Sequence, residues 1–266
     1  MQVLEREVLA LDELTARELH FWKEFNQFTR SKVGRPYLEG KLYQEIERAV
    51  DELLGHPRGR WFDAGCGNLP VTKWLLEKER SDIHIWAGDI DISGAEEELR
   101  RIDNPNAVTV IQVDLRREWP FPENFFDGIV ANHVFTFLAR SNVAISREEP
   151  LVRALREAHR VLKPGGVLIW TVPRPDAGAL AGLPHTLRYL LNPLRWLKYG
   201  PSLLITAVKT ARYVRQIERK AKSGIYTLAS KEECEKILTA IGFTNLEWRQ
   251  VFAKQSWLNR AVKQPR

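Results

Sequence analysis

A glycine loop that follows a short apolar run is the stretch of this sequence best suited to hold a ligand. The run at residues 60–64 leads into Asp63-Ala64-Gly65-Cys66-Gly67, and a helical pattern starts at about residue 71. Glycines at positions i and i+2 let the backbone turn tightly and approach a ligand with no Cβ in the way. The start of the next helix offers unpaired amide hydrogens to a carboxylate or phosphate. Taken alone, the loop is explained equally well as a tight structural turn.

Acidic residues follow two further apolar runs. Asp91 lies 24 residues beyond Gly67, directly after the run at 84–90, and Asp114 ends the run at 108–113. A carboxylate at the first position suits the two hydroxyl donors of a ribose. The alternative for Asp91 is an N-cap of the helix expected at 94–101, and one residue can serve both roles.

The elements that must position these residues alternate along the chain. Apolar runs at 60–64, 84–90, 108–113, 126–131 and 167–172 predict strands, and 71–78, 94–101 and 151–162 predict helices. Such alternation indicates an α/β fold with a doubly wound, mostly parallel sheet covered on both faces. A helix at 231–241 and strands at 245–251 and 256–263 complete seven strands, and helical spacing at 1–55 predicts N-terminal helices.

Composition narrows the class of protein. The 266 residues are 44% hydrophobic and contain two distant cysteines, Cys66 and Cys234, so neither a disulfide framework nor a metal site is expected. The N-terminus lacks the pattern of a secretory signal, and no apolar run reaches the length of a spanning helix. We therefore expect the protein in a reducing, cytoplasmic compartment, either free or in peripheral contact with a membrane surface.

The motifs together resemble the class I S-adenosylmethionine-dependent methyltransferases, in particular the small-molecule group that includes quinone and sterol methyltransferases. They occur in family order between about residues 58 and 172. The matching stretches are Asp63-Ala64-Gly65-Cys66-Gly67, Asp91-Ile92-Ser93, Asp114, FDGIVANHV at 126–134 and LREAHRVLKPGG at 155–166. The resemblance implies a seven-stranded Rossmann-like fold, S-adenosylmethionine (SAM) as the methyl donor, S-adenosylhomocysteine as its product, and no metal.

The resemblance also implies roles for individual residues. Asp63, Ala64 and the backbone of Gly65, Cys66 and Gly67 would hold the methionine part of SAM, and Asp91 would bind the ribose hydroxyls. Ile92 would pack on the adenine, Asp114 would accept from its amino group, and Leu115 would lie beside the ring. Asn132 and His133 would line the methyl-transfer site.

One position departs from the family pattern. The loop of the family carries a third small residue where this chain has Asn68-Leu69-Pro70, so the methionine end of SAM is expected to sit slightly differently. Pro70 is acceptable in the first turn of a helix. A nicotinamide-binding Rossmann domain is the nearest rival, but it requires a further glycine in a GxGxxG loop, and this chain has none.

Whether methyl transfer needs a general base depends on the chemistry of the acceptor. A neutral amine needs none, whereas a phenol or an activated carbon must lose a proton. His133 is the first candidate for that base, and packing or lining without proton transfer explains it equally well. Tyr37, His185 and Tyr226 are further candidates for the acceptor site.

Residues 174–225 interrupt the domain at 56–266 as a helical insertion, and 1–55 form a helical cap. The insertion carries ten Lys or Arg and two acidic residues, a net charge of +8 that leaves −2 for the rest of the chain. It is either a lid over the pocket or a basic amphipathic surface for an anionic membrane. We therefore expect methylation of a small, lipophilic acceptor. The alternatives are a nucleic-acid methyltransferase that uses this basic segment, and a cofactor-binding protein without catalysis.

Overall fold

The computed structural model describes residues 13–34, 41–54, 57–77, 82–140, 148–176 and 190–265. Its strands are β1 (Gly59–Ala64), β2 (Ile83–Asp89), β3 (Val108–Gln112), β4 (Phe126–Ala131), β5 (Leu162–Pro173), β6 (Phe243–Val251) and β7 (Ser256–Lys263). Its longer helices are α1 (Glu13–Arg30), α3 (Lys41–Leu54), α6 (Pro150–Val161), α9 (Ser202–Lys222) and α10 (Lys231–Ile241). Shorter ones are α4 (Pro70–Leu76), α5 (Ser93–Leu99) and α8 (Pro193–Tyr199).

The strands form one seven-stranded sheet in the order β3-β2-β1-β4-β5-β7-β6. Neighbours among β1 to β5 pair in parallel, whereas β7 pairs antiparallel with both β5 and β6. The chain winds outward from β1 in two directions, so the carboxyl ends of β1 and β4 lie next to each other where the strand order reverses. The predicted fold class is confirmed, and ligands of such sheets bind at this reversal.

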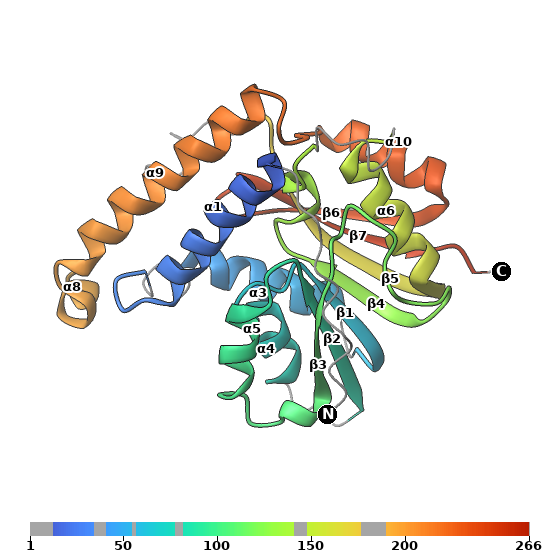
Figure 1. Ribbon diagram of the computed structural model, residues 1–266, viewed down its shortest axis with the longest axis horizontal. Helices are drawn as coiled ribbons and strands as arrows, with labels where there is room; N and C mark the ends of the chain where they lie inside the picture. The colour runs from blue at the N-terminus through green and yellow to red at the C-terminus, as the bar shows by residue number, and fades with distance from the viewer. Residues whose placement is uncertain are drawn as a thin grey trace.

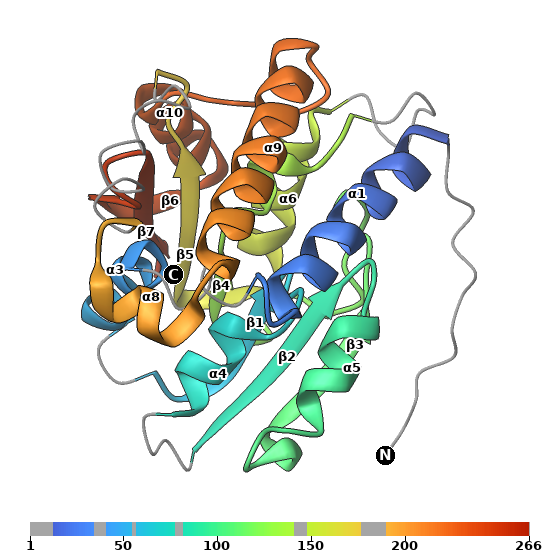
Figure 2. The same ribbon diagram turned by 90° about the vertical axis from the view of Figure 1, so that its left-hand side faces the viewer.

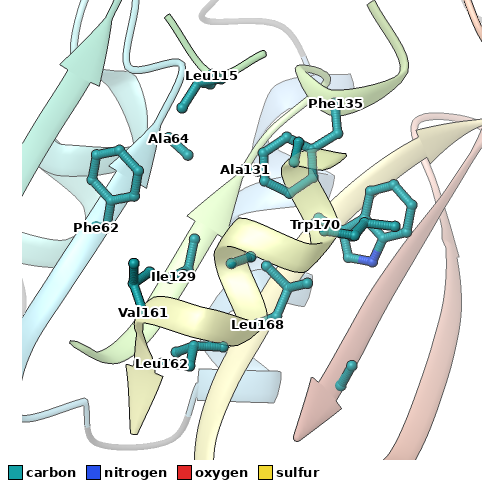
Figure 3. Close-up of a cluster of buried hydrophobic side chains, with 14 of the residues drawn as sticks. Phe62, Ala64, Leu115, Ile129, Ala131, Phe135, Val161, Leu162, Leu168 and Trp170 are labelled. Carbon is teal, nitrogen blue, oxygen red and sulfur yellow. The ribbon is translucent and has the colours of Figure 1, made fainter. Parts of the chain in front are cut away.

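Hydrophobic side chains cover both faces of the sheet because successive strand residues point to opposite sides. Phe62 belongs to a buried cluster that also contains Trp170 and apolar side chains of α6 and α10, and Figure 3 shows part of this cluster. Its neighbour Trp61 instead packs with α3 and α4 through Ile46 and Leu75. The sheet is thus enclosed between helical layers (Figure 1), and the ends of its strands stay available for a site.

One predicted element differs from the structure. The strand predicted at 167–172 is longer in the structure, because β5 already begins at Leu162 and includes Lys163-Pro164-Gly165-Gly166. Leu162 pairs with Phe126, and the next pair joins Val167 to Gly128, so the register shifts and the extra residues bulge out of β5. Gly165 lies in this bulge with φ +79°, a conformation that glycine adopts without strain.

Two helices from opposite ends of the chain lie side by side. Both views show α9 next to α1 on the same side of the sheet (Figures 1 and 2). The Tyr213 ring of α9 contacts Phe21, Phe25 and Phe28 of α1, with centroid distances of 5.7, 5.1 and 5.6 Å. Among the residues described, no helix has the length and apolar character needed to cross a bilayer.

Candidate functional site

A cavity of about 780 Å³ lies between the carboxyl ends of the strands and the helices α1 and α9. This volume is within the range of small-molecule sites. From the strand ends and the loops after them it is lined by Asp63, Gly65, Cys66, Gly67, Asp89, Asp91, Asp114, Leu115, Asn132 and His133. From α1 and α9 it is lined by Glu18, Trp22, Phe25, Asn26, Val214 and Ile217, among others. The floor therefore brings several carboxylates to the cavity, and the roof combines apolar side chains with polar and charged ones.

The glycine loop forms one wall of this floor. Gly65 has φ +76° and Gly67 has φ +47°, both in the left-handed region. A Cβ on Gly65 would lie 2.4 Å from Cγ2 of Val134, whereas one on Gly67 would meet only the Asn26 side chain, at 3.5 Å. Gly65 N and Cys66 N donate to Gly88 O of β2 at 2.8 and 3.1 Å. The loop is thus tied to β2 and leaves its inner side open to a ligand.

Asp89, at the last position of β2, was not predicted as a site residue. Its Oδ2 accepts from Gly67 N at 2.9 Å, and its Oδ1 accepts from Asp91 N at 3.3 Å. Burial raises the pKa of this carboxyl, while the backbone amides of Gly67, Asp91 and Ile90 oppose the rise. One side chain therefore couples the glycine loop to the Asp91 turn. The sequence does contain this second acidic residue two positions before Asp91, but the position lies inside the strand predicted at 84–90.

Asp63 is the buried carboxylate at the end of β1. Its Oδ2 accepts from Thr72 N at 3.1 Å and from Thr72 Oγ1 at 2.7 Å, so it holds the first turn of α4 against the strand. Burial raises its pKa to about 7, Thr72 opposes the rise, and the nearby Asp89 adds to it. A positive ligand group in the cavity would favour the ionised form.

Asp91 and Asp114 both border the cavity, with different partners. Asp91 Oδ1 accepts from Ser93 N at 3.1 Å, and its Oδ2 lies 3.9 Å from Lys23 Nζ of α1. The carboxylate of Asp114 receives two bonds from the buried Arg116, Nε to Oδ1 at 2.9 Å and NH2 to Oδ2 at 2.8 Å. Oδ1 also accepts from Arg116 N at 3.0 Å, so the position expected to accept from an adenine amino group already has both lone pairs of this oxygen in use.

A polar network holds the residues that follow β4. Thr171 Oγ1 donates to Asn132 Oδ1 at 3.0 Å and accepts from His133 N at 2.5 Å. His133 has φ +55°, and its Nε2 lies 2.9 Å from Ser256 Oγ of β7. Burial lowers the pKa of the imidazole to about 4, so the ring is neutral at pH 7.

A partly buried ion pair joins α1 and α9 in the roof. Lys220 Nζ lies 2.8 Å from Glu18 Oε2, and the Tyr226 hydroxyl donates to the same oxygen. The Lys220 ammonium also lies 3.6 Å from the ring centroid of Phe21. Burial, together with Glu18, raises the pKa of the Tyr226 hydroxyl. Such a pair resists separation because each charge would be left buried alone.

The predicted site residues are largely brought together. Asp63, Gly65, Cys66, Gly67, Asp91, Asp114, Leu115, Asn132 and His133 all border the cavity. Ala64, Ile92 and Tyr226 are not among the lining residues: Ala64 is fully buried in the core, Ile92 precedes α5, and Tyr226 is 2% exposed. Tyr37 and His185 lie outside the described residues.

The sequence predicted a cap at 1–55 and, as one alternative, a lid at 174–225, but it did not identify Trp22, Phe25 or Ile217 as residues that line the cavity. The helical spacing at 13–30 predicts a helix, but nothing in it shows which strand end the helix will cover. In the part of the chain that the structure describes, no three His, Cys, Asp or Glu side chains are grouped as metal ligands. The buried thiol of Cys66 stays protonated because burial raises its pKa well above the ordinary value.

Comparisons with known proteins agree with this geometry. Residues 62–170 match the family described as a methyltransferase domain. Over 150 residues the chain is 30% identical to the malonyl-acyl-carrier-protein O-methyltransferase of Erwinia pyrifoliae, a match that covers 54% of this chain and 51% of that protein. The chain thus spans about half the length of the curated relative it matches.

Solved structures share the fold at low identity. A SAM-dependent methyltransferase from Thermotoga maritima is 19% identical, with 91% of this chain and all of that chain covered and a TM-score of 0.56. The cyclase SpnF is 18% identical, with 84% and 82% covered and a TM-score of 0.52, so the fold alone does not fix the reaction. The family match is more specific, because residues 62–170 contain the carboxyl ends of β1 to β4. Residues 62–170, which supply much of the floor of this cavity, therefore match a methyltransferase domain, in agreement with the class I SAM-dependent methyltransferases that the motifs resemble.

Proposed function

We propose that this protein transfers a methyl group from SAM to a small, lipophilic acceptor held between the strand ends and the helices α1 and α9. The observation that carries the proposal is the division of a single cavity into two chemistries. Carboxylates gather around the glycine loop at its floor, and the two helices add aromatic and aliphatic side chains at its roof, beside polar ones such as Asn26 and Glu218.

The residues at the floor suit the donor. SAM carries a sulfonium and an ammonium group, and Asp63, Asp89, Asp91 and Asp114 bring four carboxyl groups to the cavity. Gly65 and Gly67 leave the loop without side chains at the wall, as close approach of a ligand requires. Asp63 and the loop backbone would hold the methionine part, and Asp91 the ribose.

The roof suits an apolar acceptor. Trp22 and Phe25 of α1, Phe137 after β4, and Val214 and Ile217 of α9 border the cavity. A rigid apolar wall favours an acceptor with aromatic or aliphatic surface, since its burial is stabilising and needs few polar partners. We infer that α1 and α9, joined through Glu18 and Lys220, act together as a cap that excludes water.

The donor, when bound, supplies an electrophilic methyl group, so the protein has mainly to align the acceptor. His133 is placed to do so, because its neutral ring borders the cavity and is held by Thr171 and Ser256. A group with a pKa of about 4 is a weak base at pH 7. We therefore propose that His133 orients the acceptor through a hydrogen bond, and that proton removal by this ring makes a small contribution.

The decisive experiment is calorimetry of the purified, folded protein with SAM and with S-adenosylhomocysteine. We expect both to bind. Turnover is then tested with labelled donor on fractionated lipid and small-molecule extracts, with a malonyl-acyl-carrier protein and an RNA pool as separate arms. Labelling confined to RNA would contradict a small acceptor, and binding without labelling in any arm would indicate a protein that senses the cofactor. Absence of binding to either compound would refute the proposal as a whole.

We expect donor binding to release a proton from Asp63. With a pKa of about 7, this carboxyl is about nine-tenths protonated at pH 6. The positive charge of SAM favours the ionised form, so the pKa falls in the complex and affinity should increase as the pH rises from 6 to 8. Calorimetry in two buffers of different ionisation enthalpy measures the released proton.

Asp63→Asn should abolish this release while keeping an acceptor for Thr72. The titration of the donor's own amino group persists in the variant, so the difference between the two proteins reports Asp63 alone. Asp127→Asn, at the opposite end of the sheet, is the matched control and should behave like the unaltered protein. Equal proton release in all three proteins would contradict the assignment.

The pH profile of turnover tests the role of His133. Because burial lowers its pKa to about 4, the ring stays neutral throughout pH 5.5–8. We expect no inflection from this group in kcat/KM over that range. His133→Gln, which keeps a polar hydrogen-bonding side chain, should lose less activity than His133→Ala. An inflection near pH 6.5 that disappears in both variants would show that the ring acts as a general base.

A further inference from the structure

The large hydrophobic side chains exposed on the described part of the chain are gathered in one place. They are Leu191, Leu194, Trp196, Leu197, Leu204, Ile205 and Val208. All of them lie between residues 191 and 208, on α8, the residues just before it, and the first two turns of α9. Figure 1 shows α8 and the start of α9 extending beyond the body of the molecule. A contiguous apolar surface of this kind marks a binding site for another surface.

The sequence left open whether this apolar stripe covers the pocket or faces outward. A lid that covered the pocket with Leu204 and Val208 would bury them, but they are 49% and 70% exposed. The inward face of α9 is instead made by Leu203 and Thr206, and farther along by Tyr213. The Thr206 hydroxyl donates to Val33 O, next to α1, and so helps to fix this orientation.

The exposed stripe changes character along α9. One turn of helix takes 3.6 residues, so Leu204, Val208, Arg212, Arg215 and Arg219 fall on the same side. All five are exposed. The first two are apolar and the last three are cationic. Between residues 190 and 222 the chain has eight Lys or Arg and a single acidic residue, Glu218. Glu218 borders the cavity. The outer side of α9 is thus apolar at its tip and positively charged behind it.

Its partner must therefore offer negative charge next to an apolar interior. An anionic bilayer surface has both, with phosphate and carboxylate headgroups above acyl chains, whereas nucleic acid offers charge without an apolar layer for leucines. Trp196 adds a ring suited to the headgroup level, 39% exposed and with its indole N–H already donated to Leu190 O.

We propose that the outer surface of α8 and α9, hereafter the tip surface, docks on anionic lipid bilayers. Leu194, Leu197 and Val208 enter the headgroup region, and the cationic residues of α9 contact the lipid charges. The opposite side of the same helix borders the cavity through Val214 and Ile217. Docking by the tip surface would place the roof of the site next to the membrane, where a lipophilic acceptor is concentrated. This consequence rests on the proposed function, whereas docking itself does not.

The test is cosedimentation with vesicles of phosphatidylcholine alone and of phosphatidylcholine with 30 mol% phosphatidylserine. We expect the full chain to bind the anionic vesicles at least about tenfold more tightly, since each cationic residue near such a surface adds attraction. Raising the salt from 0.1 to 0.5 M should weaken this binding by screening the headgroup charge.

Two variants separate the apolar and the ionic contributions. Leu197→Glu with Val208→Glu removes the apolar tip, and Arg212→Glu with Arg215→Glu reverses charge behind it. Each should lower binding to anionic vesicles by about tenfold or more. Arg48→Glu with Lys236→Glu makes an equal change of charge on α3 and α10, where both residues are exposed, and should retain more binding than the α9 charge variant. All these side chains point away from the cavity wall, so SAM affinity, measured by calorimetry, should be unchanged in each.

Three results would overturn docking on lipid. The first is equal binding to neutral and anionic vesicles, or none. The second is a concentration-dependent dimer that Leu197→Glu with Val208→Glu abolishes, which would make the tip surface a contact between two copies of the chain. The third is tighter binding to a single-stranded RNA than to the anionic vesicles. None of these results concerns the cavity. A protein that binds SAM but not lipid would therefore leave the proposed activity unaffected.

Discussion

Replacing Gly65 with alanine is expected to weaken SAM binding by about 100-fold, the equivalent of about 3 kcal/mol. The residue has φ +76°, where a side chain costs about 1–2 kcal/mol, and the new Cβ would lie 2.4 Å from Val134 Cγ2. In the free protein the loop can relieve this contact by moving away from Val134. The moved loop no longer follows the wall of the cavity, so the loss appears mainly in binding. Calorimetry with SAM measures it directly.

Gly165→Ala is the matched control for this change. Gly165 has nearly the same φ, +79°, but nothing lies within 4 Å of the position where its Cβ would be. It sits in the bulge of β5 and is not among the residues that line the cavity. The control should lose some thermal stability and retain SAM affinity. If Gly65→Ala bound SAM as well as the control does, the glycine loop would not be the wall that holds the donor.

Asp89→Ala is expected to have an effect of similar size, although the residue is not placed on SAM by the family resemblance. Its carboxylate accepts from Gly67 N and Asp91 N, so its loss frees the glycine loop and the Asp91 turn at the same time. Hydrogen bonds to a charged group contribute about 1.5–3 kcal/mol, which corresponds to about 10- to 100-fold in the dissociation constant of SAM. Asp89→Asn keeps one acceptor oxygen, so its affinity for SAM should lie between those of the unaltered protein and Asp89→Ala.

Asp127→Ala tests whether this loss is specific to the site. Asp127 also caps a strand, since its Oδ2 accepts from Arg60 N at 2.8 Å and its Oδ1 lies 2.6 Å from Lys163 Nζ. It does so at the amino end of β1, away from the cavity. The two variants should show comparable losses of thermal stability, but only Asp89→Ala should lose SAM. Equal affinity in both would mean that Asp89 has a structural role alone.

The structural neighbours explain why the assignment rests on residues rather than on the fold. A methyltransferase and a cyclase match this chain with TM-scores of 0.56 and 0.52, so one arrangement of strands and helices serves different reactions. The difference between these reactions must come from the side chains at the strand ends and in the roof. In this protein those are the carboxylates of the floor and the aromatic residues of α1.

Features of this protein that have local causes could be predicted from the order of its residues. Gly65 and Gly67 adopt positive φ because no other residue does so at comparable cost, and their spacing was visible directly. The strands were predictable because apolar residues that must be buried on both faces form short continuous runs. Ser230 caps the start of α10 through a capping box, and Gly242 caps its end. These signals are likewise confined to a few residues.

Which distant residues meet at the site depends on how the elements pack in three dimensions. Asp89 and Asp91 are two residues apart, yet one holds the loop and the other faces Lys23 of α1, because the chain leaves the strand between them. Arg116 turns back onto Asp114, a pairing that leaves no trace in the spacing of charges. The direction of α9 follows from the packing of Tyr213 on α1, which leaves Val208 outside. Contacts between elements depend on how whole surfaces fit together, and a pattern read along one helix cannot contain that information.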